Sequence, residues 1–349
     1  MLVMPDPANA PAIVGTIKGG ITLTHPITAT QLSTMNAVAH QILKLDIDVE
    51  EVDPLTPAQA AEAIKDPAIR SQTVQAMIAL EMLAPTTQRT AEEASGNKHR
   101  FQDGTLPHIE EYVRALDVKL PEMKTLNAIA SDHEEMIYLD IFFRTPVRTG
   151  LVDSIKDSGL RNTIKAIGAA RGHGSSPAVA DKFKRLEDLP EGTWGYQLAH
   201  MYQANGWLFP GETGGPPETL SIHDWVHVLS GYPPSPVGEL QVNSFIHACS
   251  EDPLSFGYMI LALAAYGLGG FNPGGQKWTT KGDAYVRDDV GQLFAEAVMR
   301  SKTVGVDLFA VDHWGQANKT VEEMREKYSI PAKTVDIGDP DPGLPSYQP

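Results

Sequence analysis

Apolar residues recur at three- and four-residue intervals along most of the chain, with polar residues between them. Leu32, Met35, Val38, Ala39 and Ile42 share one helical face, for example. The same period predicts helices over residues 31–45, 56–66, 74–83, 109–116, 120–143, 148–171, 254–268, 293–314 and 320–328. The alternation typical of strands is confined to residues 21–24, which have no evident partner. The pattern therefore predicts an all-α fold.

Shifts in composition divide this chain of 349 residues into two expected helical domains. The prolines of the first 29 residues disfavour a helix there. We expect an irregular lead over residues 1–29, a helical bundle over 30–167, a Gly- and Ser-rich linker over 168–180, a second helical domain over 181–331 and a flexible tail over 332–349. Either domain is long enough to bury its own core.

Residues 221–249 predict two helices joined by a tight turn. Ser221 is a candidate N-cap for the first helix, and Gly231 ends it by accepting the left-handed conformation. Ser235 is a candidate N-cap for the second helix. Pro236 then lies in the first turn, where the missing N–H of proline costs nothing.

This predicted hairpin carries four side chains with metal-ligand chemistry. His223 and His227 are four residues apart, so both imidazoles project from one helical face. Asp224 lies at the edge of that face, as a ligand or as an acceptor that orients an imidazole. Glu239 follows the turn, where an antiparallel helix returns its carboxylate toward the histidines. Two imidazoles with one or two carboxylates suit Zn²⁺, with Fe and Mn as rivals.

Local helix chemistry offers a competing interpretation of the same residues. Ser221 and Asp224 also form an S-x-x-D capping box, which would occupy Asp224 with a backbone N–H. Glu239 lies in a first helical turn, where the helix dipole alone favours an acid. Histidines at this spacing also occur by chance.

Three motifs follow one another between residues 180 and 331. The first is LPEGTWG at 189–195, the second is H-D-x-x-H-x(11)-E at 223–239, and the third combines DHW at 312–314 with VEEMR at 321–325. In this order they resemble the motifs of the Coq4 family of ubiquinone-biosynthesis proteins. The basic residue that this family carries before its H-D pair is absent here. Its Lys and acid after the Glu are replaced by Asn243 and Ile246, which leaves the substrate open.

The resemblance implies a metal-dependent oxidative decarboxylation, in which the C1 carboxylate of a polyprenylated benzoate is replaced by a hydroxyl. It implies that His223, His227 and Glu239 are metal ligands, and that Asp224 is a ligand or an orienting residue. The apolar helix over 254–268 would be a buried core element or a wall for the prenyl tail. The resemblance further implies a homodimer, contacts with other quinone-biosynthesis proteins and peripheral contact with a membrane.

Other functions remain open at this point. The Coq4 family is also seen as a non-catalytic scaffold for prenylated intermediates, in which the metal would be structural. An H-D phosphohydrolase would need a further His and Asp, for which His200 and Asp252 are candidates. In residues 30–145 the apolar spacing resembles the TerB-like tellurite-resistance fold.

Charge and cysteine content narrow the classes of partner and compartment. The net charge of −16 argues against nucleic acid, whose binders present a basic face. The single cysteine, Cys249, excludes an internal disulfide and fits a reducing compartment. The N-terminus lacks a basic signal-peptide region, and the apolar run 258–270 is shorter than the roughly 20 residues that span a bilayer. We therefore expect a cytoplasmic protein, peripheral on the inner membrane.

Overall fold

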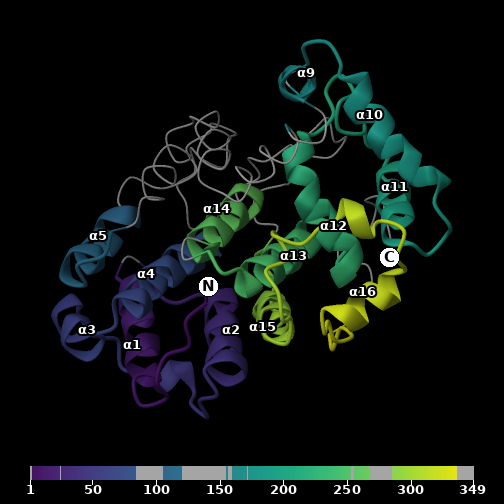
Figure 1. The fold of residues 1–349 in the computed structure, drawn as a ribbon. Helices are drawn as coiled ribbons and strands as arrows, with labels where there is room; N and C mark the ends of the chain where they lie inside the picture. The colour runs from purple at the N-terminus through teal and green to yellow at the C-terminus, as the bar shows by residue number, and fades with distance from the viewer. Residues whose placement is uncertain are drawn as a thin grey trace. The chain divides into compact units, whose positions relative to one another are not determined.

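A computed structural model describes residues 2–23, 25–83, 105–119, 155, 159–170, 172–252, 255–267 and 285–335. Within these ranges the chain is helical, and its strand-like pairing is limited to an isolated bridge between Thr193 and Thr320 (Figure 1). The all-α prediction is therefore confirmed for the described residues. The helix predicted over 120–143 and the tail beyond residue 335 lie outside them.

Tertiary contacts divide the chain into two compact units, each built from separate stretches of sequence. Unit 1 comprises Met1–Tyr138, Glu251–Gly270 and Lys281–Met299, and unit 2 comprises Leu139–Ser250, Phe271–Thr280 and Arg300–Pro349. The boundary between the units does not fall at the linker predicted over residues 168–180. Helices α9 (Leu160–Ala170) and α10 (Pro177–Lys184), which flank that segment, both belong to unit 2. Gly and Ser content reports local flexibility, whereas unit membership follows helix packing.

The irregular lead predicted for residues 1–29 is wrong, because Ala10–Ile21 form helix α1. Pro11 lies in the first turn of α1, where a missing N–H leaves no hydrogen bond unmade, and the two earlier prolines precede the helix. Ile21 is the last residue of α1 and Thr22 is its C-cap. The strand expected over residues 21–24 is therefore also wrong at these two positions, and Thr24 lies outside the described residues.

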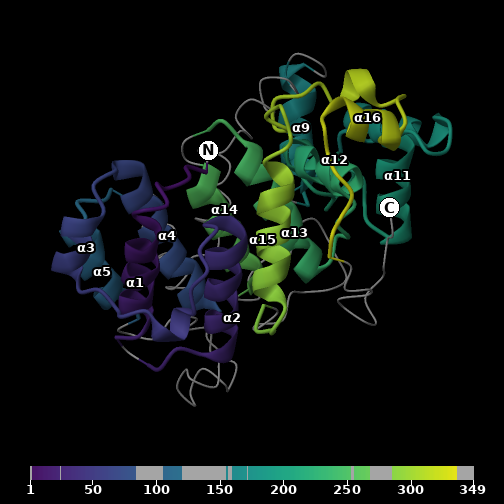
Figure 2. The same cartoon turned by 90° about the horizontal axis from the view of Figure 1, so that it is seen from below.

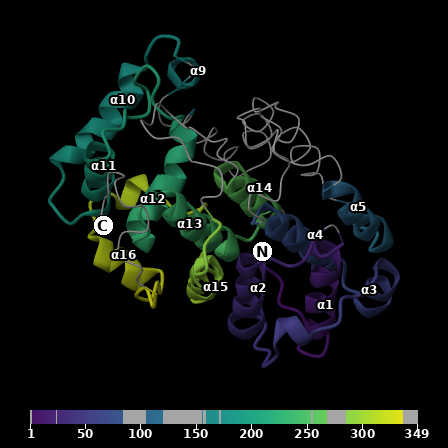
Figure 3. The same ribbon diagram turned by 180° about the vertical axis from the view of Figure 1, so that it is seen from behind.

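The remaining helices of unit 1 are α2 (Ala29–Ala37), which a π-helical turn Val38–Ile42 continues, α3 (Pro57–Ala63), α4 (Pro67–Met82), α5 (Thr105–Ala115), α14 (Ser255–Gly267) and most of α15 (Val290–Ser301), which ends well before the predicted residue 314. Helices α1, α5 and α14 contact α4, and α3 contacts α1 and α5. Helix α1 lies beside α4 in Figure 2, and α14 lies beside α4 in Figure 3. No helix among the described residues is both long enough and apolar enough to cross a bilayer.

Aromatic side chains fix the first helix of the predicted hairpin in unit 2. This helix, α12 (Ser221–Ser230), packs against α11 (Trp194–Ala204). The Trp194 indole Nε1–H donates to the Trp225 carbonyl at 2.8 Å, and the two rings meet edge to face at 5.2 Å. The centroid of the Trp314 ring lies 5.5 Å from that of the Trp225 ring. These contacts set the rotation of α12 about its axis.

Three cations hold the C-terminus of α12. Gly231 ends the helix with φ of 78°, as its sequence predicts. Arg325 of α16 (Val321–Lys327) donates from Nε to the Leu229 carbonyl at 2.8 Å. Arg300 donates to the Ser230 carbonyl at 2.7 Å, and Lys333 donates to the Gly231 carbonyl at 2.9 Å. The positive charges oppose the negative end of the helix dipole and satisfy its carbonyls.

Replacing Arg325 by Met removes the charge and its hydrogen bonds to the end of α12. A hydrogen bond to a charged group contributes about 1.5–3 kcal/mol, so Arg325→Met should lower the free energy of unfolding of unit 2 by about 2 kcal/mol. All five tryptophans lie in unit 2, so tryptophan emission during urea denaturation reports this unit alone.

The matched control for this experiment is Lys327→Met on the same helix. Lys327 is exposed and contacts Gln316 and the Tyr328 ring, so its loss should change the free energy by about 0.5 kcal/mol or less. Equal destabilisation by the two variants would contradict a specific role for Arg325.

The buried His313 makes the stability of unit 2 depend on pH. Burial lowers the pKa of His313 to about 4, below the ordinary value of 6.5. Between pH 6.5 and 4 the unfolded chain binds a proton at this histidine, whereas the folded chain does not. The free energy of unfolding should therefore fall by about 3 kcal/mol as the pH drops from 6.5 to 4. His313→Phe, which keeps a ring against Trp194 and Trp225, should reduce the slope of this part of the profile. The slope that remains comes from His247, whose pKa burial lowers to about 3. An unchanged slope in tryptophan-monitored unfolding would contradict the assignment.

Candidate metal centre

The predicted hairpin forms in unit 2 from α12 and α13 (Pro236–Cys249). Ser235 accepts a hydrogen bond from the Gly238 N–H at 3.1 Å, and Pro236 lies in the first turn, as the sequence predicts. A Cβ at Gly238 would lie 1.7 Å from the Pro233 carbonyl oxygen, so only glycine allows the turn to approach α13 this closely. This close approach places the next residue, Glu239, against α12.

The Glu239 carboxylate lies between the two histidines of α12. Its Oε2 is 3.1 Å from His223 Nε2, and its Oε1 is 3.1 Å from His227 Nε2. The imidazole centroids are 4.5 Å apart, with the rings nearly perpendicular. Asn243, one turn along α13, donates from its amide to Glu239 Oε2 at 3.3 Å and to the Glu239 carbonyl at 2.8 Å. The carboxylate is therefore held in place from both helices.

The other nitrogen of each imidazole is occupied by an oxygen acceptor. His227 Nδ1 lies 3.0 Å from the Tyr232 carbonyl oxygen, which only accepts, so Nδ1 carries a proton and Nε2 is the nitrogen that faces Glu239. His223 Nδ1 lies 3.4 Å from Asp224 Oδ1, and Asp224 Oδ2 accepts a 2.5 Å hydrogen bond from the Tyr202 hydroxyl. Both Nε2 atoms therefore face a carboxylate, which requires a cation or a proton between them.

Electrostatics within the cluster lead to the same requirement. Burial alone would lower the pKa of His223, but Glu239 and Asp224 outweigh it and raise this pKa to about 10. Burial would raise the pKa of Glu239, but the two histidines outweigh it and hold that pKa well below its usual range. Burial, followed by the charge of Asp224, raises the pKa of the Tyr202 hydroxyl, which keeps it a donor. The site thus stabilises positive charge beside Glu239.

The donor set fits a divalent transition metal. His223, Asp224 and His227 offer donor atoms that all lie within 4.8 Å of one another, so this group could hold an ion. Two ligands of a tetrahedral zinc ion are about 3.3 Å apart, given Zn–N distances of about 2.0–2.1 Å. The two 3.1 Å approaches to Glu239 are close to that separation. Imidazole nitrogens favour Zn or Fe over Ca²⁺ and Mg²⁺, which take oxygen ligands, and the carboxylate also suits Mn.

The competing helix-capping interpretation is wrong for Ser221 and Asp224. Ser221 is the first residue of α12, Leu220 is the N-cap, and no side chain caps the helix there. The Ser221 hydroxyl instead donates to the Glu218 carbonyl at 2.7 Å. Asp224 is engaged by Tyr202 and His223, which suits a residue that orients an imidazole.

Three contributors to the centre escape sequence reasoning. Tyr202 reaches Asp224 from α11, Asn243 supports Glu239, and the Tyr232 carbonyl fixes the tautomer of His227. Asn243 has a signal in hindsight, because it lies four residues after Glu239 on the same helical face. His200, considered for a phosphohydrolase, is exposed and stacks on Tyr196, outside the donor group.

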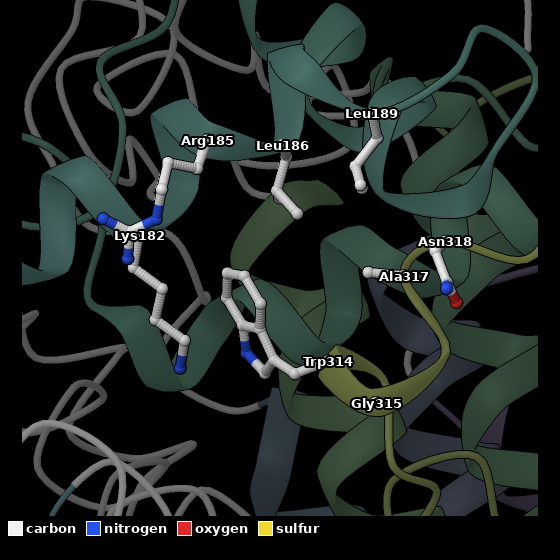
Figure 4. Close-up of a pocket in the computed structure, with 8 residues that line it drawn as sticks. All are labelled: Lys182, Arg185, Leu186, Leu189, Trp314, Gly315, Ala317 and Asn318. Carbon is white, nitrogen blue, oxygen red and sulfur yellow. The ribbon is translucent and has the colours of Figure 1, made fainter.

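A shallow pocket elsewhere in unit 2 is unrelated to this centre. It has a volume of about 390 Å³ and is lined by Lys182, Arg185, Leu186, Leu189, Trp314, Gly315, Ala317 and Asn318 (Figure 4). None of the donor residues lines it. The Lys182 ammonium lies 4.0 Å from the Trp314 ring centroid and 3.1 Å from Glu218, so its charge is already compensated.

No family model, no curated protein and no solved structure matches this chain.

Removing either histidine of α12 should remove one bound metal ion per chain. In purified protein reconstituted with Zn²⁺ and desalted, His223→Ala and His227→Gln should each lower the metal content by one equivalent, because two remaining donors bind weakly. The matched control is His200→Ala, which changes an exposed histidine of the same unit and should keep the full content. Elemental analysis provides the measurement, with tryptophan emission as the check of folding.

Asp224→Asn distinguishes an orienting residue from a ligand. An orienting role predicts metal affinity about 10–100-fold weaker with the ion still bound at saturation. Full metal content at unchanged affinity in all these variants would contradict the assignment of the centre.

Proposed function

We propose that this chain is a metal-dependent protein of ubiquinone biosynthesis that replaces the C1 carboxylate of a polyprenylated benzoate by a hydroxyl. One observation carries the proposal: both histidines of α12 turn Nε2 toward the buried carboxylate of Glu239, while oxygen acceptors hold their Nδ1 atoms. These are the residues whose spacing resembles the Coq4 motif. The donor set suits Zn, Fe or Mn, and the redox step of this reaction requires Fe or Mn rather than Zn.

The centre has a buried side and a more accessible side. The exposed fraction of the side chain is 22% for His223 and 15% for Asp224, against 1% for His227 and 3% for Glu239. A substrate carboxylate and its neighbouring phenol oxygen therefore approach on the His223 side, while the buried side excludes water. A bound metal supplies Lewis-acid stabilisation of charge on the ring, and Fe or Mn also supplies a redox step that Zn lacks.

The chain's own residues orient the donors during this reaction. Asp224, held by the Tyr202 hydroxyl, keeps the His223 ring turned toward Glu239. Asn243 restrains the carboxylate so that it presents both oxygens to the histidines. Helix α14 is not assigned to the prenyl tail, because Tyr258, Met259 and Ile260 are buried and α14 packs against α4 within unit 1.

Near-complete burial of half the centre favours a second candidate, a non-catalytic scaffold. Structural zinc sites are closed, whereas catalytic sites keep an open position. Asn243 and Ile246 also stand where the resembling family carries a Lys and an acid. In this alternative the chain holds prenylated intermediates and partner enzymes together. In both candidates the chain forms a homodimer in peripheral contact with a membrane.

The two candidates give different results in a decarboxylation assay. The substrate is a prenylated hydroxybenzoate labelled in its carboxyl carbon, with dioxygen as oxidant and ascorbate as reductant. Protein loaded with Fe or Mn should release labelled CO₂ and form the ring hydroxyl, whereas Zn-loaded protein should not, because Zn²⁺ has no accessible redox step. His223→Ala should lose the activity.

The scaffold is supported instead if every metal form releases CO₂ at the rate without protein while the prenylated ligand binds. Retention of binding is measured with vesicles that contain the labelled lipid. Failure of both turnover and binding would contradict the proposed role in prenylated-quinone chemistry.

A further inference from the structure

Unit 1 contains a second buried carboxylate between two histidines. Glu81 lies in the last turn of α4, His108 lies in the first turn of α5, and His25 lies between α1 and α2. The Glu81 side chain is 3% exposed, and those of His108 and His25 are 8% and 18% exposed. Three segments far apart in sequence therefore bring two imidazoles to one buried acid.

The distances repeat the pattern of the centre in unit 2. His25 Nε2 lies 3.4 Å from Glu81 Oε2, and His108 Nε2 lies 3.4 Å from Glu81 Oε1. Ligands of a tetrahedral zinc ion are about 3.3 Å apart by the same geometry as above. Glu81 Oε1 lies this close to His108 Nε2, but this oxygen makes no hydrogen bond with any described residue. The approach is therefore close without the alignment of a hydrogen bond.

The second nitrogen of His25 is held by a backbone carbonyl. Its Nδ1 lies 2.9 Å from the Pro26 carbonyl oxygen. Because a carbonyl only accepts, Nδ1 donates to it, and Nε2 is the nitrogen that faces Glu81 Oε2. Metal-bound histidines have this arrangement, with the distal N–H held by a backbone carbonyl.

The charge of Glu81 needs a compensating cation. A buried carboxylate without a partner is strongly destabilised, and the ion pairs of Glu81 within the described part of the chain are both with histidines. A proton on an imidazole or a metal ion between the three groups satisfies this need.

We propose that His25, Glu81 and His108 bind a zinc-class divalent metal ion that joins the three segments of unit 1. Two imidazoles and a carboxylate select Zn²⁺ or Co²⁺ over Ca²⁺ or Mg²⁺. Among the described residues, donor atoms that all lie within 4.8 Å of one another are found on α12 and not at Glu81, so binding an ion there requires the His25 and His108 rings to move closer together.

Co²⁺ binding tests this site in the full-length chain with the unit 2 centre removed. In the His223→Ala/His227→Gln background, the protein should bind one equivalent of Co²⁺ and show the intense visible absorption of a tetrahedral ion. Adding His25→Ala or Glu81→Gln should abolish that absorption and reduce Co²⁺ affinity at least tenfold. Glu81→Gln preserves the shape of the side chain, and circular dichroism checks that each variant is folded.

The matched control is His40→Ala, which changes an exposed histidine of unit 1 whose ring contacts the Ile47 carbonyl and should keep the Co²⁺ spectrum. The proposal is overturned if the folded background protein binds no Co²⁺, because an imidazolium then compensates Glu81. It is also overturned if binding persists without His25, His108 and Glu81. Since the background lacks the α12 histidines, these outcomes are independent of the proposed function of unit 2.

Discussion

The buried carboxylate of Glu239 is the constraint on which the rest of unit 2 depends. Removing a charged group from water is costly unless opposite charge and hydrogen bonds surround it. Here two imidazoles and the Asn243 amide provide that environment, at distances of 3.1–3.3 Å. The hairpin therefore has one register in which α13 fits against α12, because a slip would leave the acid buried without a partner.

The helices around the hairpin serve to hold α12 in that register. The Trp194–Trp225 contact sets the rotation of α12, and the cations of Arg300, Arg325 and Lys333 hold its C-terminal carbonyls. Arg325 belongs to the VEEMR segment, whose resemblance to a known motif gives no physical role by itself. In the structure its role is to cap the helix that carries His227, from almost a hundred residues away in sequence.

Both compact units bury one glutamate between two histidines. In each unit, Nδ1 of one histidine ring contacts a backbone carbonyl oxygen, and Nε2 of the same ring faces the glutamate. These rings are His227 in unit 2 and His25 in unit 1. The surroundings differ, because the α12 pair comes from a single helix whereas the unit 1 pair comes from a loop and a separate helix. A pair on one helix is visible as a sequence spacing, and a pair assembled from distant segments is not.

Sequence alone determined what depends on neighbours within one or two turns. The helical class, the stop at Gly231, the cap at Ser235 and the common face of His223 and His227 follow from local backbone chemistry and the helical repeat. It misjudged the first residues, because proline is harmless in the first turn of α1.

Tertiary structure alone decided which distant groups meet. The Tyr202 bond to Asp224, the unit boundaries and the His25–Glu81–His108 cluster join segments that no periodicity connects. These contacts form because helices pack to bury apolar faces, and the polar groups carried along must then find partners.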